Sequence, residues 1–314
     1  MADALNVLVL LPLNESQRRR LETGAPEAAY TYTTSDAATT EQLSQAEVIV
    51  GNLAPERLGE AARLRLLQLN SAGFDRYVGG VMPAGAQLAS ASGAYGQAVS
   101  EHVFAMVLAM MKNLPAYRDD QLRHAWEDHG SVTTLRDARV LVMGTGDIGG
   151  HFARLCSAVG AHVIGVRRHV GAVPEGFEAV RTMAELPELL GQADLVASFL
   201  PSTPETRGLV DAAFFAAMRP GAYFANGGRG DLVVTDDLVR ALEDGMLAGA
   251  ALDVTSPEPL PAESPLWDAP GALITPHVSG GFHLPQVLDN IAGIAAENLR
   301  RLQAGEQPLN LVRP

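Results

Sequence analysis

Short apolar segments alternate with longer segments of mixed polarity along the whole chain. In the N-terminal third the apolar runs are 6–12, 46–52, 65–73 and 87–93, with a helical segment expected between the first two. Nearly continuous apolar runs separated by helices are typical of a parallel sheet covered on both faces. The pattern therefore predicts a small α/β unit in this part of the chain.

A second series of the same kind occupies the middle of the chain. Its predicted strands are 138–144, 162–166, 194–200, 222–228, 249–254 and 272–277. Helices are expected directly after the first of these strands and at about 183–191, 211–218 and 235–245. Strands and helices in this alternation predict one complete doubly wound domain.

Two long helical patterns flank the second series. Residues 99–118 form an apolar helix candidate that starts near Ser100 and His102 and ends near Pro115. A helix this apolar is buried, at a domain or a subunit interface. The final helix, at about 285–304, lies outside the series and is expected to return to the first domain.

The expected fold class is α/β, with two Rossmann-like doubly wound domains. Residues 1–98 and 283–314 would form a discontinuous, flavodoxin-like substrate domain, and residues 99–282 a dinucleotide-binding domain.

Composition and charge narrow the range of partners. The chain has 314 residues, 47% of them hydrophobic, and a net charge of -13. An acidic surface repels nucleic-acid backbones and anionic lipid, so neither nucleic acid nor a membrane is an expected partner. The one cysteine, Cys156, is expected to be a buried structural thiol. The N-terminus lacks the positive charge of a signal peptide, and Val103–Met111 is too short to span a bilayer, which predicts a soluble, cytoplasmic protein.

Three glycines follow the first strand of the second series, in the sequence RVLVMGTGDIGG. The G-x-G-x-x-G spacing between a strand and a helix is the dinucleotide fingerprint. Gly144 permits the tight turn, Gly146 lets the backbone approach a pyrophosphate, and Gly149 lets the helix pack on the strand. The helix N-terminus offers free N–H groups to the phosphates. Thr145, Asp147 and Ile148 complete this predicted cofactor loop.

The next strand ends in arginines. A cofactor with a free ribose 2′-hydroxyl usually meets an acidic residue about 20 residues after the glycines. Here Arg167 and Arg168 occupy that place. Two guanidinium groups suit a 2′-phosphate, which favours NADP(H) over NAD(H). A solvated basic loop end is the alternative interpretation.

Polar residues lie at the ends of three later strands. Arg229, Glu258 and His277 follow apolar runs, and ligands bind at the carboxyl ends of strands in open α/β sheets. Arg229 can pair with the carboxylate of a 2-keto acid and polarise its carbonyl. His277 can then supply a proton to the forming alkoxide, and Glu258 can fix the tautomer of its ring. The three residues together favour hydride transfer to a 2-keto acid.

Several motifs extend this picture into a family resemblance. The segments SAGFD (71–75), AVSEHVFAMVLAM (98–110), MGTGDIGG (143–150), LPSTPETRGLV (200–210), NGGRGDLV (226–233), LDVTSPEPLP (252–261) and TPHVSG (275–280) occur in the order typical of one family. The chain resembles the D-isomer-specific 2-hydroxyacid dehydrogenases, in the NADP-preferring glyoxylate/hydroxypyruvate reductase-like branch. That resemblance implies two domains with a cleft between them, a homodimer, and no metal.

The resemblance also implies roles for individual residues. Arg229, Glu258 and His277 match the family's catalytic Arg, Glu and His, and a glutamate at 258 argues against the formate dehydrogenase branch. The backbone N–H groups of Ala72 and Gly73 match the positions that hold the substrate carboxylate, together with Arg229 and His277. The further cofactor contacts are Leu200, Pro201, Thr206, Gly227, Gly228, Asp253 and Gly280.

The leading hypothesis is thus an oxidoreductase that transfers hydride between NADP(H), or alternatively NAD(H), and a small-molecule 2-keto acid/D-2-hydroxy acid pair. Two alternatives stay open. One is a non-catalytic dinucleotide-sensing partner protein, against which the intact Arg229, Glu258 and His277 argue. The other keeps the fold and changes the substrate, for example to phosphite.

Overall fold

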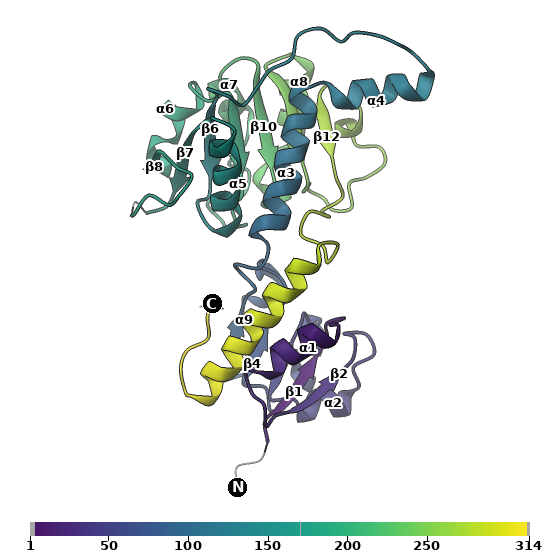
Figure 1. Ribbon diagram of the computed structural model, residues 1–314, viewed down its shortest axis with the longest axis vertical. Helices are drawn as coiled ribbons and strands as arrows, with labels where there is room; N and C mark the ends of the chain where they lie inside the picture. The colour runs from purple at the N-terminus through teal and green to yellow at the C-terminus, as the bar shows by residue number, and fades with distance from the viewer. Residues whose placement is uncertain (1–3, 170, 313–314) are drawn as a thin grey trace. The chain divides into compact units, whose positions relative to one another are not determined.

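The computed structural model describes residues 4–169 and 171–312 (Figure 1). Contacts between Cα atoms divide the chain into two compact units. Unit 1 is Met1–Tyr95 with Phe282–Pro314, and unit 2 is Gly96–Gly281. The substrate-binding and dinucleotide-binding roles expected for the two parts of the chain stay predictions.

Unit 1 is built on one six-stranded sheet with the order β13–β5–β4–β3–β1–β2. The order β2–β1–β3–β4–β5 is that of the flavodoxin-like fold, and only β13 pairs antiparallel. The strands are β1 Asn6–Val9, β2 Ala29–Tyr32, β3 Val48–Val50, β4 Leu66–Gln68, β5 Gln87–Ala89 and β13 Leu311–Val312. The helices are α1 Glu15–Glu22, α2 Thr40–Gln45 and α9 Pro285–Gln303.

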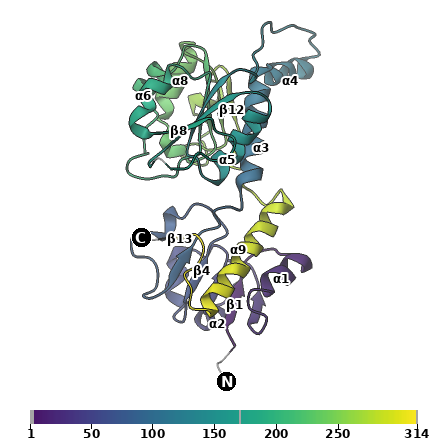
Figure 2. The same ribbon diagram turned by 60° about the vertical axis from the view of Figure 1, so that its left-hand side comes forward.

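Helix α9 covers the sheet of unit 1 beside α1 (Figure 2). Its buried face is apolar apart from Asn298, whose amide donates a 2.6 Å hydrogen bond to the buried Gln68 of β4. Gln17 of α1 donates a 2.9 Å hydrogen bond to Asp289 of α9. The N- and C-terminal parts of the chain therefore share one core.

Unit 2 is built on a seven-stranded sheet with the order β12–β11–β10–β9–β6–β7–β8, and every pair in it is parallel. The strands are β6 Arg139–Met143, β7 His162–Arg167, β8 Ala179–Thr182, β9 Leu195–Ser198, β10 Ala222–Asn226, β11 Leu247–Leu252 and β12 Ala272–Ile274. The helices are α3 Gly96–Met111, α4 Leu114–Arg123, α5 Asp147–Ala158, α6 Leu186–Leu190, α7 Ala212–Ala217 and α8 Thr235–Glu243. This strand order is that of the Rossmann fold, so the predicted fold class is confirmed.

The chain order reverses between β6 and β9, and this reversal is the switch point where ligands bind in open α/β sheets. The glycine loop follows β6, and Leu200 follows β9. A Cβ placed on Gly144 would lie 3.5 Å from the Leu200 side chain, so the two loops are in contact. The fold therefore brings two predicted cofactor segments together within unit 2.

The predicted helix over 99–118 is wrong as one element. Helix α3 ends at Met111, and α4 starts at Leu114 after Asn113, which has a left-handed φ of 55°. Pro115 lies in the first turn of α4, where its missing N–H costs nothing, rather than at a helix end. Strands β2, β8 and β13 also lie outside the predicted strands.

Two further expectations concern burial. Cys156 is fully buried in α5, and burial raises the pKa of its thiol to about 12, which fits a structural residue rather than a nucleophile. In the part of the chain that the structure describes, no helix combines the length and the apolar character needed to cross a membrane.

Candidate active site

The glycine loop has the geometry of a phosphate cradle. Gly144 has a φ of 95°, which favours glycine. A Cβ on Gly149 would lie 1.9 Å from the Gly144 carbonyl oxygen, so this glycine is required by the protein's own packing. A Cβ on Gly146 would meet nothing within 4 Å, although Gly146 is the N-cap of α5. The open space at Gly146 and the uncapped helix N-terminus together fit a bound pyrophosphate.

A cavity of about 940 Å³ in unit 2 opens beside this loop. Six residues predicted from the sequence to contact the cofactor line it: Gly144, Arg167, Arg168, Leu200, Pro201 and Thr206. Its inner wall is apolar, with Leu186, Leu190 and Phe214 from α6 and α7. A largely apolar cavity whose lining includes two arginines suits the adenosine end of a phosphorylated dinucleotide.

Arg167 and Arg168 differ in how they are held. Arg167 ends β7, and one of its terminal nitrogens donates a 2.9 Å hydrogen bond to the Ala172 carbonyl. Its Nε is buried and has no hydrogen-bond partner among the described residues. Arg168 is exposed, and its charge contributes to lowering the pKa of Glu205, after two hydrogen bonds at Glu205 that lower it more. An unpaired N–H donor on a residue that lines the cavity is a group that an anionic ligand could satisfy.

The loop after β9 is closed by its own side chains. The Thr206 hydroxyl donates a 2.7 Å hydrogen bond to the Pro201 carbonyl and accepts one from the Thr203 N–H at 2.8 Å. Asp231 accepts hydrogen bonds from Ser202 at 2.6 Å and forms an ion pair with Arg207 at 3.2 Å. Asp231 thereby ties this loop to the turn that carries Arg229, a role for which the sequence offered no signal.

Arg229 directly follows the Gly227–Gly228 pair, which comes after β10. The buried amide of Asn226 holds this turn, accepting from the Gly228 N–H at 3.1 Å and donating to the Arg229 carbonyl at 2.9 Å. The Arg229 guanidinium, half-buried, donates to the Gly228 carbonyl at 2.9 Å. The two glycines are also needed for packing, since a Cβ on either would clash with Val103 or with the Leu200 backbone.

Glu258 and His277 are brought together by the structure. Oε2 of Glu258 lies 2.9 Å from Nδ1 of His277, and Oε1 accepts a hydrogen bond from the Thr255 N–H at 3.1 Å. Because a carboxylate only accepts, Nδ1 carries a proton and the other ring nitrogen, Nε2, is the one available for proton transfer. Both side chains are partly exposed, as a proton donor to a ligand requires.

Asp253 holds the turn on which His277 lies. Its carbonyl accepts the His277 N–H at 2.8 Å, and its carboxylate accepts the Val278 N–H at 3.0 Å and the Ser279 N–H at 3.2 Å. The residue is 1% exposed. Gly280 follows this turn and is partly buried. The contact of Asp253 and Gly280 with a cofactor stays a prediction.

In unit 1, the SAG turn follows β4. Neither the Ala72 nor the Gly73 N–H donates a hydrogen bond to any described residue. The turn is held from the side by two asparagines that accept each other's backbone N–H groups, Asn52 from Asn70 at 3.1 Å and Asn70 from Asn52 at 2.6 Å. Two free, adjacent N–H groups form an anion nest.

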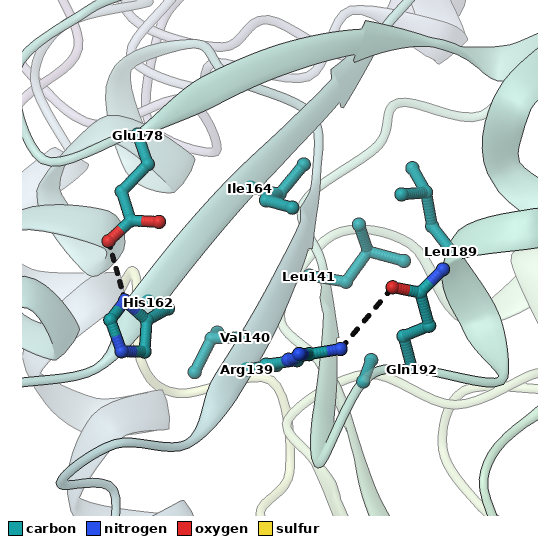
Figure 3. A pocket seen from close by; sticks show the side chains of 9 residues that line it. Arg139, Val140, Leu141, His162, Ile164, Glu178, Leu189 and Gln192 are labelled. Atoms are coloured by element: carbon teal, nitrogen blue, oxygen red, sulfur yellow. Dashed lines mark hydrogen bonds and ion pairs between the residues drawn. The ribbon is translucent and has the colours of Figure 1, made fainter.

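Another hollow, of about 310 Å³, opens at the amino ends of the strands in the unit 2 sheet (Figure 3). It is lined by the first residues of β6 and β7, and Figure 3 shows its two polar pairs, His162 with Glu178 and Arg139 with Gln192. None of the predicted site residues lines it. Among the described residues there is also no cluster of His, Cys, Asp and Glu suited to a metal ion.

Comparison with known proteins identifies the family of the chain. Residues 104–279 match the family model for the NAD binding domain of D-isomer specific 2-hydroxyacid dehydrogenases. The chain is 32% identical over 268 residues to glyoxylate/hydroxypyruvate reductase A of Serratia proteamaculans, covering 82% of each chain. A family protein from Aeromonas salmonicida superposes with a TM-score of 0.87 at 32% identity over 99% of both chains. An NADPH-dependent glyoxylate/hydroxypyruvate reductase from Sinorhizobium meliloti, in complex with NADP and sulfate, gives 0.82 at 28% identity over 98% of both.

The fold and these matches define an oxidoreductase with a nicotinamide dinucleotide-binding domain. The chain belongs to the D-isomer specific 2-hydroxyacid dehydrogenase family, in the branch of the glyoxylate/hydroxypyruvate reductases.

Proposed function

We propose that the protein reduces a small 2-keto acid to the D-2-hydroxy acid with NADPH. The observation that carries this proposal is the 2.9 Å contact between Glu258 and Nδ1 of His277, at the sheet edge that also carries Arg229 and the glycine loop. A histidine oriented by a carboxylate is the usual form of a general acid that must present one defined nitrogen.

In this mechanism Arg229 binds the substrate. Its planar guanidinium pairs with the carboxylate and polarises the adjacent carbonyl oxygen as negative charge develops there. Asn226 keeps the backbone of this turn in place through its two hydrogen bonds. A nicotinamide cofactor, when bound, would supply the hydride for the reduction.

His277 supplies the proton in the same mechanism. Nε2–H donates to the carbonyl oxygen, which becomes the hydroxyl of the product, while Nδ1–H stays bonded to Glu258. The Glu258 carboxylate stabilises the positive ring before the transfer and fixes its orientation throughout. In the reverse direction neutral His277 accepts the hydroxyl proton.

The residues around the cavity support NADPH as the preferred cofactor. Arg167 and Arg168 would bind the 2′-phosphate, and the glycine loop with Asp147 and Ile148 would hold the pyrophosphate at the N-terminus of α5. The S. meliloti relative is named as NADPH-dependent. NAD(H) is the second choice.

The proposed substrate class rests on a turn that suits an anion and on the printed name of one relative. The free N–H groups of Ala72 and Gly73 in unit 1 suit a carboxylate. The S. proteamaculans relative is named for glyoxylate and hydroxypyruvate, so these two acids are the first candidates. We infer a cytoplasmic location from the sequence alone.

We also propose a homodimer. Helix α4 and the loop after it expose four large apolar side chains: Leu114, Leu122, Trp126 and Val132. Trp126 is fully exposed, and a fully exposed tryptophan is rare on the surface of a monomer. A second copy of this chain would cover that surface.

The experiment is oxidation of NADPH, followed by absorbance, with purified protein and a panel of glyoxylate, hydroxypyruvate, pyruvate, 2-ketoisovalerate and phenylpyruvate, each repeated with NADH. We expect turnover of the smaller acids and a preference for NADPH. Tight binding of NADPH without turnover of any acid would contradict the proposal and favour a sensing role. Reduction of NADP with phosphite would favour the other alternative.

A further inference from the structure

Helix α3 contacts the segment that leads to His277 through one polar side chain, His102. The helix packs on β11 and α5 with a buried face that includes Val103, Met106 and Val107. His102 lies on the same helix and is 30% exposed. Its Nε2 lies 3.0 Å from the Thr275 hydroxyl and 3.7 Å from Oδ1 of Asp253. Thr275 directly follows β12, two residues before His277.

The donor and the acceptor in each hydrogen bond between His102, Thr275 and Asp253 can be assigned by elimination. Asp253 accepts from the Thr275 hydroxyl at 2.6 Å, and a carboxylate has no proton to give. The Thr275 proton is therefore used, and its oxygen must accept from His102. Nε2 of His102 thus carries a proton, whichever charge the ring has.

The carboxylate at the centre is otherwise surrounded by neutral groups. Asp253 accepts from backbone N–H groups and from hydroxyls of Thr275 and Ser279, and among the described residues no Lys or Arg pairs with it. Among the described residues, His102 is the one side chain close to this carboxylate that can carry a positive charge, with Nε2 3.7 Å from Oδ1. A carboxylate that is only 1% exposed is costly unless it is hydrogen-bonded, so the Thr275 hydroxyl that His102 holds on Asp253 contributes to stabilising it.

We propose that His102 is a positioning residue for the reaction. It holds the Thr275 hydroxyl on Asp253, and Asp253 sets the backbone of the turn that carries His277 through the 2.8 Å bond to the His277 N–H. His277 has a left-handed φ of 52°. For a non-glycine residue this backbone conformation costs free energy, so it persists only where the surrounding structure holds it, and Asp253 is part of that structure. The proposal rests on His277 being the general acid.

The test compares two replacements of His102. His102→Phe keeps an aromatic ring and removes the donor, whereas His102→Gln keeps an N–H donor at a similar reach. We expect kcat with the best keto acid to fall about tenfold or more in the Phe variant with little change in the KM for NADPH, because a small displacement of a catalytic group costs this much. The Gln variant should recover most of that loss.

A second readout does not depend on turnover. The ring signals of His277, assigned among the protein's eight histidines by their loss in His277→Asn, are compared by NMR between the parent and the two variants. We expect them to shift in His102→Phe and to stay near the parent position in His102→Gln. A folded His102→Phe protein with unshifted His277 signals overturns the positioning role. If the parent turns over no keto acid, the NMR comparison still decides the inference while the proposed reaction fails.

Discussion

The two histidines that face a glutamate in unit 2 show how little a residue pair means without its place in the sheet. Nδ1 of His277 lies 2.9 Å from Glu258, and Nδ1 of His162 lies 2.6 Å from Glu178. Both pairs are partly exposed. The first is at the carboxyl ends of the strands, the edge that also carries Arg229, and the second is at the start of β7. Only the first is at the edge where ligands bind.

This contrast gives a matched pair of variants. His277→Asn should lower kcat by about 10²–10⁴-fold, because a general acid contributes that much. His162→Asn removes the same kind of ion pair and should leave kcat near the parent value. Steady-state kinetics of both, with thermal unfolding as the check on folding, test this. Equal kinetics in the two variants would remove His277 from the mechanism.

Arg167 carries the second prediction at this scale. Arg167→Asp should reduce the preference for NADPH over NADH by about tenfold or more, since a charge-assisted bond to the 2′-phosphate is replaced by repulsion. Arg139→Asp, with the same charge change at the start of β6, is the control and should leave the ratio of kcat/KM values unchanged. An unchanged ratio in Arg167→Asp would make this arginine a surface residue only.

Among the elements, the β6–loop–α5 segment has one glycine that tests packing, Gly149, and one that tests cofactor binding, Gly146. Gly149→Ala places a methyl group 1.9 Å from the Gly144 carbonyl oxygen, so we expect a loss of about 1–3 kcal/mol in unfolding free energy and weaker NADPH binding. Gly146→Ala adds a methyl group into open space. It should leave the melting temperature nearly unchanged and still weaken NADPH binding.

Thermal unfolding and fluorescence titration with NADPH measure these two effects separately. Parent-like affinity in Gly146→Ala would show that no ligand approaches the backbone there.

The last turns of α9 provide a pH-dependent prediction. Hydrogen bonds from Arg300 and Arg301 lower the pKa of Glu297 from its ordinary 4.5 to about 2. A lowered carboxyl pKa contributes stability above the ordinary value, and that contribution disappears as the pH falls from about 4.5 towards 2. Glu297→Gln should therefore be less stable than the parent at pH 7, and the difference should shrink in that window.

Urea unfolding at a series of pH values measures this difference. Glu27→Gln is the control, because Glu27 is exposed and forms no ion pair among the described residues. A difference between parent and Glu297→Gln that is constant with pH would contradict the assignment.

The elements also show what sequence patterns can predict. The apolar central strands and the helices between them were predictable because burial on both faces demands continuous apolar runs. β2, β8 and β13 were not, because edge strands such as Ala29–Tyr32 are half exposed and keep no such run. The break between α3 and α4 depends on the left-handed Asn113, for which the apolar pattern gives no signal.

The same limit applies to the site. Arg229, Glu258 and His277 could be selected from the sequence because each follows a strand, and strand ends meet at one edge. The structure brings Glu258 and His277 together, and the catalytic roles of all three stay predictions. Asn226, Asp231 and His102 were missed as supporting residues because their partners are set by which loops and helices become neighbours. That information is in the packing of unit 2 rather than in any local motif.

At the scale of the whole molecule, the exposed side chains after α3 predict association. Trp126→Glu should convert a dimer into a monomer, because it places a charge in the centre of the proposed interface. Sedimentation equilibrium gives the mass directly. The chain has one other tryptophan, Trp267, which is 48% exposed, and Trp267→Phe should stay dimeric. A monomeric parent protein would refute the dimer.

The division of the chain into two units also affects the order in which they can fold during synthesis. Unit 2 is one uninterrupted stretch, Gly96–Gly281, whereas unit 1 draws on both ends of the chain and needs α9 to cover its sheet. Domains generally fold as units while the ribosome is still working. When Gly281 has left the ribosome, unit 2 has all of its residues, but the first 95 residues still expose the apolar face that α9 will cover. The part of the protein made first is therefore the part completed last.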